Sequence, residues 1–96
     1  TGIATGRVRV LTSAKECDQM QHGEVLVAVM TRPDYLPAMK KAVAIVTDEG
    51  GITCHAAIVS RELRIPCIIG TGNATTQLRT GDRVCVDANA NSVTLL

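Results

Sequence analysis

The chain has 96 residues, of which 46% are hydrophobic, and a formal net charge of +1 at pH 7. A chain of this length forms one domain around one core. Its weak net charge, with both signs interspersed, argues against a face that binds nucleic acid or an anionic membrane. A single aromatic residue, Tyr35, supplies no platform for stacking bases. The apolar runs are shorter than the roughly 20 residues that a membrane-spanning helix needs.

Cysteine usage argues against a zinc site and a disulfide framework. The four cysteines include no C-x-x-C pair, and the chain has only two histidines. Such spacing does not match structural zinc ligands. No signal-peptide pattern stands at the N-terminus. We therefore expect a reduced, cytoplasmic protein.

The first half of the chain predicts strands that alternate with short helices. Residues 6–11 alternate polar and apolar, as a half-buried strand does. A capping box at residues 13–16 opens a short helix to about residue 20, which ends at His22 and Gly23. His22 is expected to be exposed. Continuous apolar runs, typical of parallel strands covered on both faces, occupy residues 24–30, 42–46 and 67–69.

Helices and a hairpin complete the predicted order. Pro37 suits the first turn of a short helix within residues 31–41, because its missing N–H costs nothing there. A second helix is predicted over residues 53–64, and one or two further turns within residues 71–78. Residues 83–87 and 92–96 indicate a closing hairpin after a turn at 81–82. The order predicts an α/β domain: a parallel sheet with two right-handed crossovers, and antiparallel strands from the chain ends.

The candidate site lies where the strand ending at residue 46 passes through a glycine-rich loop into the second helix. Ligands of α/β proteins bind beyond the carboxyl ends of the strands. Gly50 and Gly51 can adopt positive φ and approach a ligand closely, and consecutive N–H groups there can form an anion nest. His55 falls on the first helical turn, where free N–H groups and the helix dipole attract anions. A histidine in that place is a candidate nucleophile for a phosphoryl group.

Neighbouring residues can stabilise the phosphoryl group on His55. Thr53 is a good N-cap whose hydroxyl can instead bond the histidine or a phosphoryl oxygen. The guanidinium of Arg61 lies further along the helix and reaches back only if the side chain folds toward the N-terminus. We assign His55 as the catalytic residue. The phosphoryl-stabilising candidates are Thr53, Gly50, Gly51, Cys54 and Arg61.

The string GGITCHAAIVSRELRIP at residues 50–66 resembles the phosphohistidine segment of the mobile domain of phosphoenolpyruvate-utilising enzymes. The resemblance extends over essentially the whole chain, including TRPDYLPAMKK at residues 31–41 and IIGTGNAT at residues 68–75. Cysteine before the histidine resembles the phosphoenolpyruvate synthase (pyruvate, water dikinase) branch. Arg64 departs from the family, which usually has glycine there. A non-glycine residue is strained at that position if its φ is positive.

The resemblance implies a swivelling β/β/α sandwich, with a central parallel sheet, a second antiparallel sheet and helices on one side. Residues 1–96 would form one phosphohistidine domain of a longer multidomain enzyme. A nucleotide-binding domain would transfer the β-phosphoryl of ATP to Nε2 of His55. A TIM-barrel domain would pass it to pyruvate enolate, giving phosphoenolpyruvate. This chain contains no P-loop motif and no carboxylate cluster for Mg²⁺. We therefore expect it to bind no cofactor itself, with Mg²⁺ and ATP on partner domains of the same enzyme or in trans.

Other functions stay open at this point. The acceptor could differ, as in a related dikinase or an antibiotic phosphotransferase. A stand-alone copy could be a non-catalytic module that binds anions. A cysteine enzyme using Cys54 and His55 is disfavoured, because neighbours on a helix point about 100° apart.

Overall fold

A computed structural model of the chain describes residues 2–51 and 55–96. Strands and short helices alternate along these residues, as the sequence predicts. In chain order the elements are β1 (Ile3–Val10), η1 (Ala14–Gln19), β2 (Val25–Ala28), η2 (Pro33–Tyr35), α1 (Leu36–Met39), β3 (Ala44–Thr47), α2 (His55–Leu63), β4 (Cys67–Ile68), α3 (Ala74–Gln77), β5 (Arg83–Asp87) and β6 (Ser92–Leu95).

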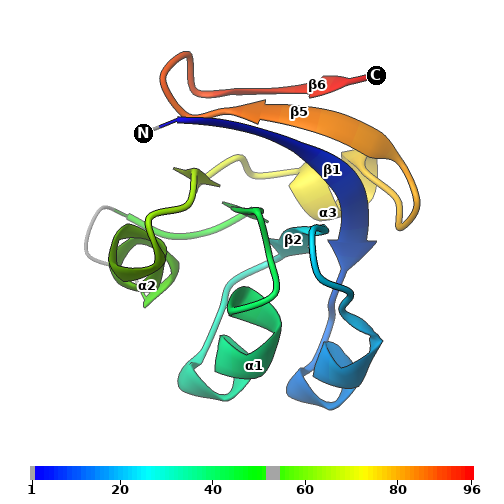
Figure 1. Cartoon of the computed structure of the whole chain (residues 1–96), viewed down its shortest axis with the longest axis vertical. Coiled ribbons are helices and arrows are strands. Elements are labelled where there is room, and N and C mark those ends of the chain that lie inside the picture. The colour runs from blue at the N-terminus through cyan, green and yellow to red at the C-terminus, as the bar shows by residue number, and fades with distance from the viewer. Residues whose placement is uncertain (1, 52–54) are drawn as a thin grey trace.

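The described strands form one curled sheet in the order β4-β3-β2-β1-β5-β6. From β1 to β4 the neighbours run parallel, whereas β5 is antiparallel to both β1 and β6. The long β1 belongs to both parts. Its first residues, Ile3 to Arg7, pair with β5, and its last, Val8 to Val10, pair with β2. In Figure 1 this strand curves from the antiparallel hairpin into the parallel strands.

Two apolar clusters on opposite faces of the parallel strands give the molecule its layers. Strand β2 is buried along its whole length, with Leu26 and Ala28 in one cluster and Val25 and Val27 in the other. The first cluster lies beneath η1, α1 and α2. The second lies between the parallel strands and β5, and the short α3 packs there as well. The view in Figure 1 separates the helices α1 and α2 from the β5–β6 hairpin in the same way. The expected β/β/α arrangement is therefore confirmed.

Several element bounds differ from the predicted ones. Strand β1 begins at Ile3 rather than at residue 6, because pairing with β5 continues the strand through residues that show no strong local pattern. The helix after the capping box is a 3₁₀ helix. Its Glu16 carboxylate accepts hydrogen bonds from the backbone N–H groups of Thr12 (2.7 Å) and Ser13 (3.1 Å). Residues 31–41 form a 3₁₀ turn followed by α1, with Pro37 in the first turn of α1 as predicted.

Helix α2 ends in a Schellman motif centred on Arg64. The N–H of Ile65 donates to the carbonyl of Ser60 (3.1 Å), and that of Arg64 donates to the carbonyl of Arg61 (3.3 Å). This pair of bonds requires a left-handed residue after the helix, which is usually glycine. Arg64 takes that role with φ +60°. The strain that the sequence predicted for a non-glycine residue here is thus present.

None of the helices in residues 2–51 and 55–96 is long and apolar enough to cross a membrane. His22 is exposed, as expected.

Candidate functional site

His55 shares a pocket with residues that follow two neighbouring parallel strands. The pocket has a volume of about 390 Å³ and is lined by Met30, Thr31, Glu49, Gly50, His55 and Ala56. Met30 and Thr31 come just after β2, and Glu49 and Gly50 come just after β3. His55 and Ala56 belong to the first turn of α2. Because β2 and β3 are parallel, their carboxyl ends meet at this edge of the sheet.

The imidazole of His55 is oriented by a buried hydroxyl. Its Nδ1 lies 3.0 Å from Oγ1 of Thr31, which is 7% exposed. Within the described residues, Nε2 of the half-buried ring makes no hydrogen bond. When Nδ1 carries the proton, it donates to the threonine oxygen and Nε2 holds the lone pair. The contact therefore suits a ring whose Nε2 reacts.

Thr31 was not named as a site residue from the sequence. Residues 31–41 stood out there only as a segment resembling the family, and a threonine after a strand has no distinctive signature of its own. Its contact joins residues 24 positions apart in the chain, so only the pairing of β2 with β3 and the packing of α2 reveal it.

The glycine-rich loop adopts the backbone that the sequence predicts at Gly50, where φ is +133°. The Thr47 hydroxyl donates to the carbonyl of Glu49 (2.7 Å), and the Glu49 N–H donates to the carbonyl of Val29 (2.9 Å). The first bond lies within the loop segment, and the second ties the loop to the residues after β2. The side chain of Glu49 is exposed at the rim, where solvent and salt screen its charge.

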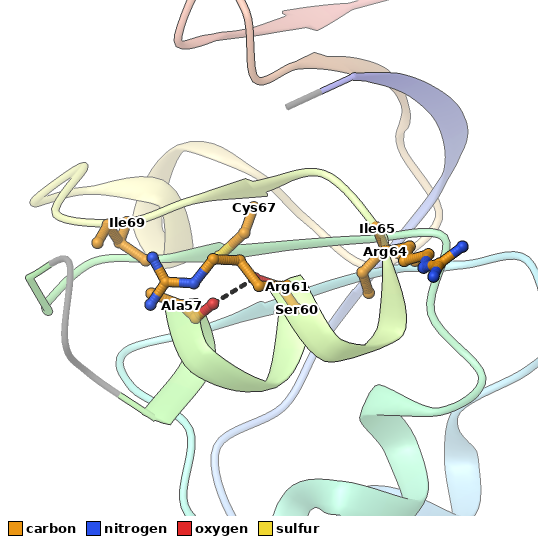
Figure 2. A pocket seen from close by; sticks show the side chains of 7 residues that line it. All are labelled: Ala57, Ser60, Arg61, Arg64, Ile65, Cys67 and Ile69. Carbon is orange, nitrogen blue, oxygen red and sulfur yellow. Dashed lines mark hydrogen bonds between the residues drawn. The ribbon is translucent and has the colours of Figure 1, made fainter.

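The other candidate residues are divided between a second pocket and the part of the chain outside the described residues. Thr53 and Cys54 lie outside the described residues. Arg61 lines a pocket of about 570 Å³ between α2 and β4, which does not include His55. In Figure 2 the Arg61 side chain folds back over Ala57, the direction that the sequence argument required, whereas Arg64 points the opposite way. A contact of Arg61 with a phosphoryl group on His55 stays a prediction.

Comparison with known proteins decides the family. The model of the mobile domain of PEP-utilising enzymes matches residues 20–91, about three quarters of the chain. The chain belongs to this family. The chain is 56% identical over 92 residues to a probable phosphoenolpyruvate synthase of Methanothermobacter thermautotrophicus. It is 58% identical over 92 residues to the phosphoenolpyruvate synthase of Pyrococcus furiosus. Both alignments cover 96% of the chain.

The mobile domain is a small part of those relatives, spanning 14% and 11% of their lengths. Among solved structures, the solution structure of Enzyme I (nEIt) superposes with a TM-score of 0.71 and 34% identity. The match covers 82% of this chain and 33% of that one. The resemblance to phosphoenolpyruvate-utilising enzymes and the expected fold are both confirmed by these likenesses.

Proposed function

We propose that this mobile domain is the phosphocarrier of a phosphoenolpyruvate synthase-type phosphotransferase, with His55 as the residue that is transiently phosphorylated. The observation that carries the proposal is the 3.0 Å contact between Nδ1 of His55 and Thr31, in a pocket at the carboxyl edge of the parallel strands. It orients the ring and directs the reaction to Nε2. The high identity to named phosphoenolpyruvate synthases supports the same reaction class.

The chemistry follows from the tautomer. With Nδ1–H donating to Thr31, the Nε2 lone pair attacks the phosphorus of the donor. A P–N bond forms, the donor's P–O bond breaks, and the leaving oxygen keeps the electron pair. The ring then carries positive charge, and Thr31 continues to accept the Nδ1–H bond. In the second transfer the pyruvate enolate oxygen attacks the phosphorus, the P–N bond breaks, and the neutral ring returns.

The start of α2 and the loop before it stabilise the phosphoryl group carried by His55. Backbone N–H groups near Gly50 and Gly51 and the N-terminus of a nine-residue helix favour negative charge. We propose that Thr53, Cys54 and Arg61 add hydrogen bonds or charge, as phosphoryl transfer requires at its equatorial oxygens.

Partner domains supply the two sites between which the phosphoryl group moves. We propose a nucleotide-binding domain that holds ATP and Mg²⁺, and a TIM-barrel domain that holds pyruvate or phosphoenolpyruvate, in the same enzyme or in trans. Exposed apolar side chains near His55 suit transient docking: Met30 lines the pocket and is 43% exposed, and Ile58, on α2, is 44% exposed. Cytoplasmic localisation stays a prediction from the composition.

Phosphorylation can be tested in the natural full-length polypeptide, incubated with phosphoenolpyruvate and Mg²⁺ and digested at alkaline pH. Mass spectrometry should find one acid-labile phosphoryl group on the peptide that contains His55. Substitution His55→Gln should abolish it, whereas His22→Gln, which changes the exposed histidine far along the sequence, should not. Offering pyruvate to the phosphorylated protein should regenerate phosphoenolpyruvate.

The outcomes separate the alternatives. A phosphoryl group on His55 that pyruvate does not remove would indicate a related dikinase or an antibiotic phosphotransferase with another acceptor. Absence of label from both phosphoenolpyruvate and ATP would refute the carrier function and favour a non-catalytic anion-binding module. Label that survives His55→Gln would show that the wrong residue was assigned.

A further inference from the structure

Asp48 makes a dense set of hydrogen bonds just before the glycine-rich loop. Its Oδ1 accepts from the backbone N–H of Thr75 (3.0 Å), and its Oδ2 accepts from the Thr75 hydroxyl (2.5 Å). The hydroxyl of Thr71 lies 3.4 Å from the same Oδ1. Asp48 is half-buried, and its two carboxylate oxygens are bonded by Thr75 in the first turn of α3, with Thr71 of the turn after β4 close to Oδ1.

The backbones of the two segments are joined as well. The N–H of Thr71 donates to the carbonyl of Thr47 (3.1 Å), and the N–H of Gly72 donates to the carbonyl of Asp48 (2.9 Å). The Thr71 hydroxyl donates to the same Thr47 carbonyl (3.1 Å). The turn after β4 is therefore fastened to the end of β3 through main chain and side chain together.

This junction reaches the His55 pocket through two adjacent residues. Asp48 immediately precedes Glu49 and Gly50, which line the pocket together with Thr31 and His55. The turn approaches Gly50 closely, since a Cβ placed on Gly70 would lie 3.4 Å from the carbonyl oxygen of Gly50. Thr31 contacts the imidazole directly, whereas Asp48 is bonded to the residues that follow β4 and is adjacent in sequence to the pocket-lining Glu49.

We propose that Asp48 is a positioning residue for phosphoryl transfer: its carboxylate holds the loop that faces His55 in the geometry needed for in-line attack. This inference rests on the proposed function. Charge-assisted bonds to a carboxylate are among the stronger ones in proteins. A displacement of about 1 Å in a catalytic site can slow a reaction about 100-fold.

A role limited to capping α3 makes a different prediction. That helix has only four residues, and the Thr71 hydroxyl already accepts from the N–H of Ala74 (3.2 Å) at its start. If Asp48 merely capped α3, its loss would lower stability without altering the His55 pocket. If it positions the loop, its loss slows phosphoryl transfer in a protein that remains folded.

Asp48→Ala and Asp48→Asn separate position from charge. Asparagine keeps an acceptor for the Thr75 N–H, and its NH₂ can donate to the Thr75 hydroxyl, so the geometry survives without the charge. Asp87→Ala is the matched control. Asp87 also accepts two backbone N–H bonds, from Asn89 and Ala90 at 3.0 Å each, but in the β5–β6 hairpin.

The experiment measures the rate of His55 phosphorylation in the natural full-length polypeptide, with phosphoenolpyruvate and Mg²⁺ under single-turnover conditions. At saturating phosphoenolpyruvate, Asp48→Ala should be about 10- to 100-fold slower than wild type, with the half-saturating concentration little changed. The phosphorylation rate of Asp48→Asn should lie within about threefold of the wild-type rate, because the position of the loop is kept. The rate of the control Asp87→Ala should lie within about twofold of wild type, because its change is remote from the pocket. Equal rates for the two alanine variants, or an asparagine variant as slow as Asp48→Ala, would overturn the proposal.

A second readout does not depend on activity. In ¹⁵N spectra of the same variants, Asp48→Ala should shift the Glu49, Gly50 and His55 signals, whereas Asp87→Ala should leave them in place. If wild type takes up no phosphoryl group, the proposed function fails. The spectra then still decide whether Asp48 sets the pocket, and unchanged signals in Asp48→Ala would refute that role.

Discussion

Replacing Arg64 by glycine should stabilise the domain. Arg64 has φ +60° at the end of α2, in a Schellman motif that keeps it there through the Ile65 N–H bond to Ser60. For an L-residue the left-handed conformation costs about 1–2 kcal/mol. Glycine relieves this cost but adds about 0.4–1 kcal/mol of backbone entropy in the unfolded chain. The net gain in the free energy of unfolding is about 0.5 kcal/mol, after a further few tenths are lost with the cation near the helix C-terminus.

Thermal denaturation by circular dichroism measures the effect, with Arg64→Ala as the matched control. Alanine also lacks the guanidinium but keeps the strain, so the difference between the two variants isolates the backbone term. For a domain of this size, about 1 kcal/mol corresponds to about 4–8 °C in Tm. Arg64→Gly should therefore melt several degrees above Arg64→Ala. If Arg64→Gly melts with or below Arg64→Ala, the strain does not exceed the backbone entropy that glycine adds to the unfolded chain, and the predicted stabilisation is wrong.

The remaining predictions concern the site, the capping box and the sheet. Thr31→Val should slow phosphorylation of His55 about 2- to 10-fold by removing one hydrogen bond, and Thr31→Ser should restore the rate; equal rates for all three proteins would contradict the orienting role. The hydrogen bond from the Thr12 hydroxyl lowers the pKa of Glu16. This stabilising effect is present above the ordinary glutamate value of about 4.3 and is lost as the pH falls through the lowered value. The advantage of wild type over Glu16→Gln in Tm should therefore shrink between neutral and acidic pH, and a constant difference would refute this. Gly6→Ala would place a Cβ 2.5 Å from a backbone carbonyl oxygen in the turn before β2. It should lower the free energy of unfolding by about 1–3 kcal/mol, which urea titration would detect; an unchanged midpoint would show that the turn gives way freely.

Much of the fold was predictable from local pattern. Runs of buried aliphatic residues at β2 and β3 identify parallel strands because both faces of such strands must be covered. Some signals involve only residues that are close in sequence: Pro37, the capping-box Glu16 and the turn before β5. Their structural effects can therefore be predicted without knowledge of the tertiary fold. His55 also stood out locally, as a histidine at the junction of a glycine-rich loop and a helix.

Contacts between distant segments were not predictable in this way. The extension of β1 to Ile3 depends on pairing with β5, about 80 residues later. The Thr31 hydroxyl reaches His55 only because β2 and β3 are neighbours, and Asp48 meets Thr75 only because β4 lies beside β3. A threonine or an aspartate in a loop satisfies its hydrogen bonds with water equally well in the unfolded chain, so its sequence position carries no mark of its partner. The residue types and their local order therefore determine which chemistry this chain offers. The pairing of strands decides which hydroxyl orients the imidazole and which carboxylate holds the facing loop.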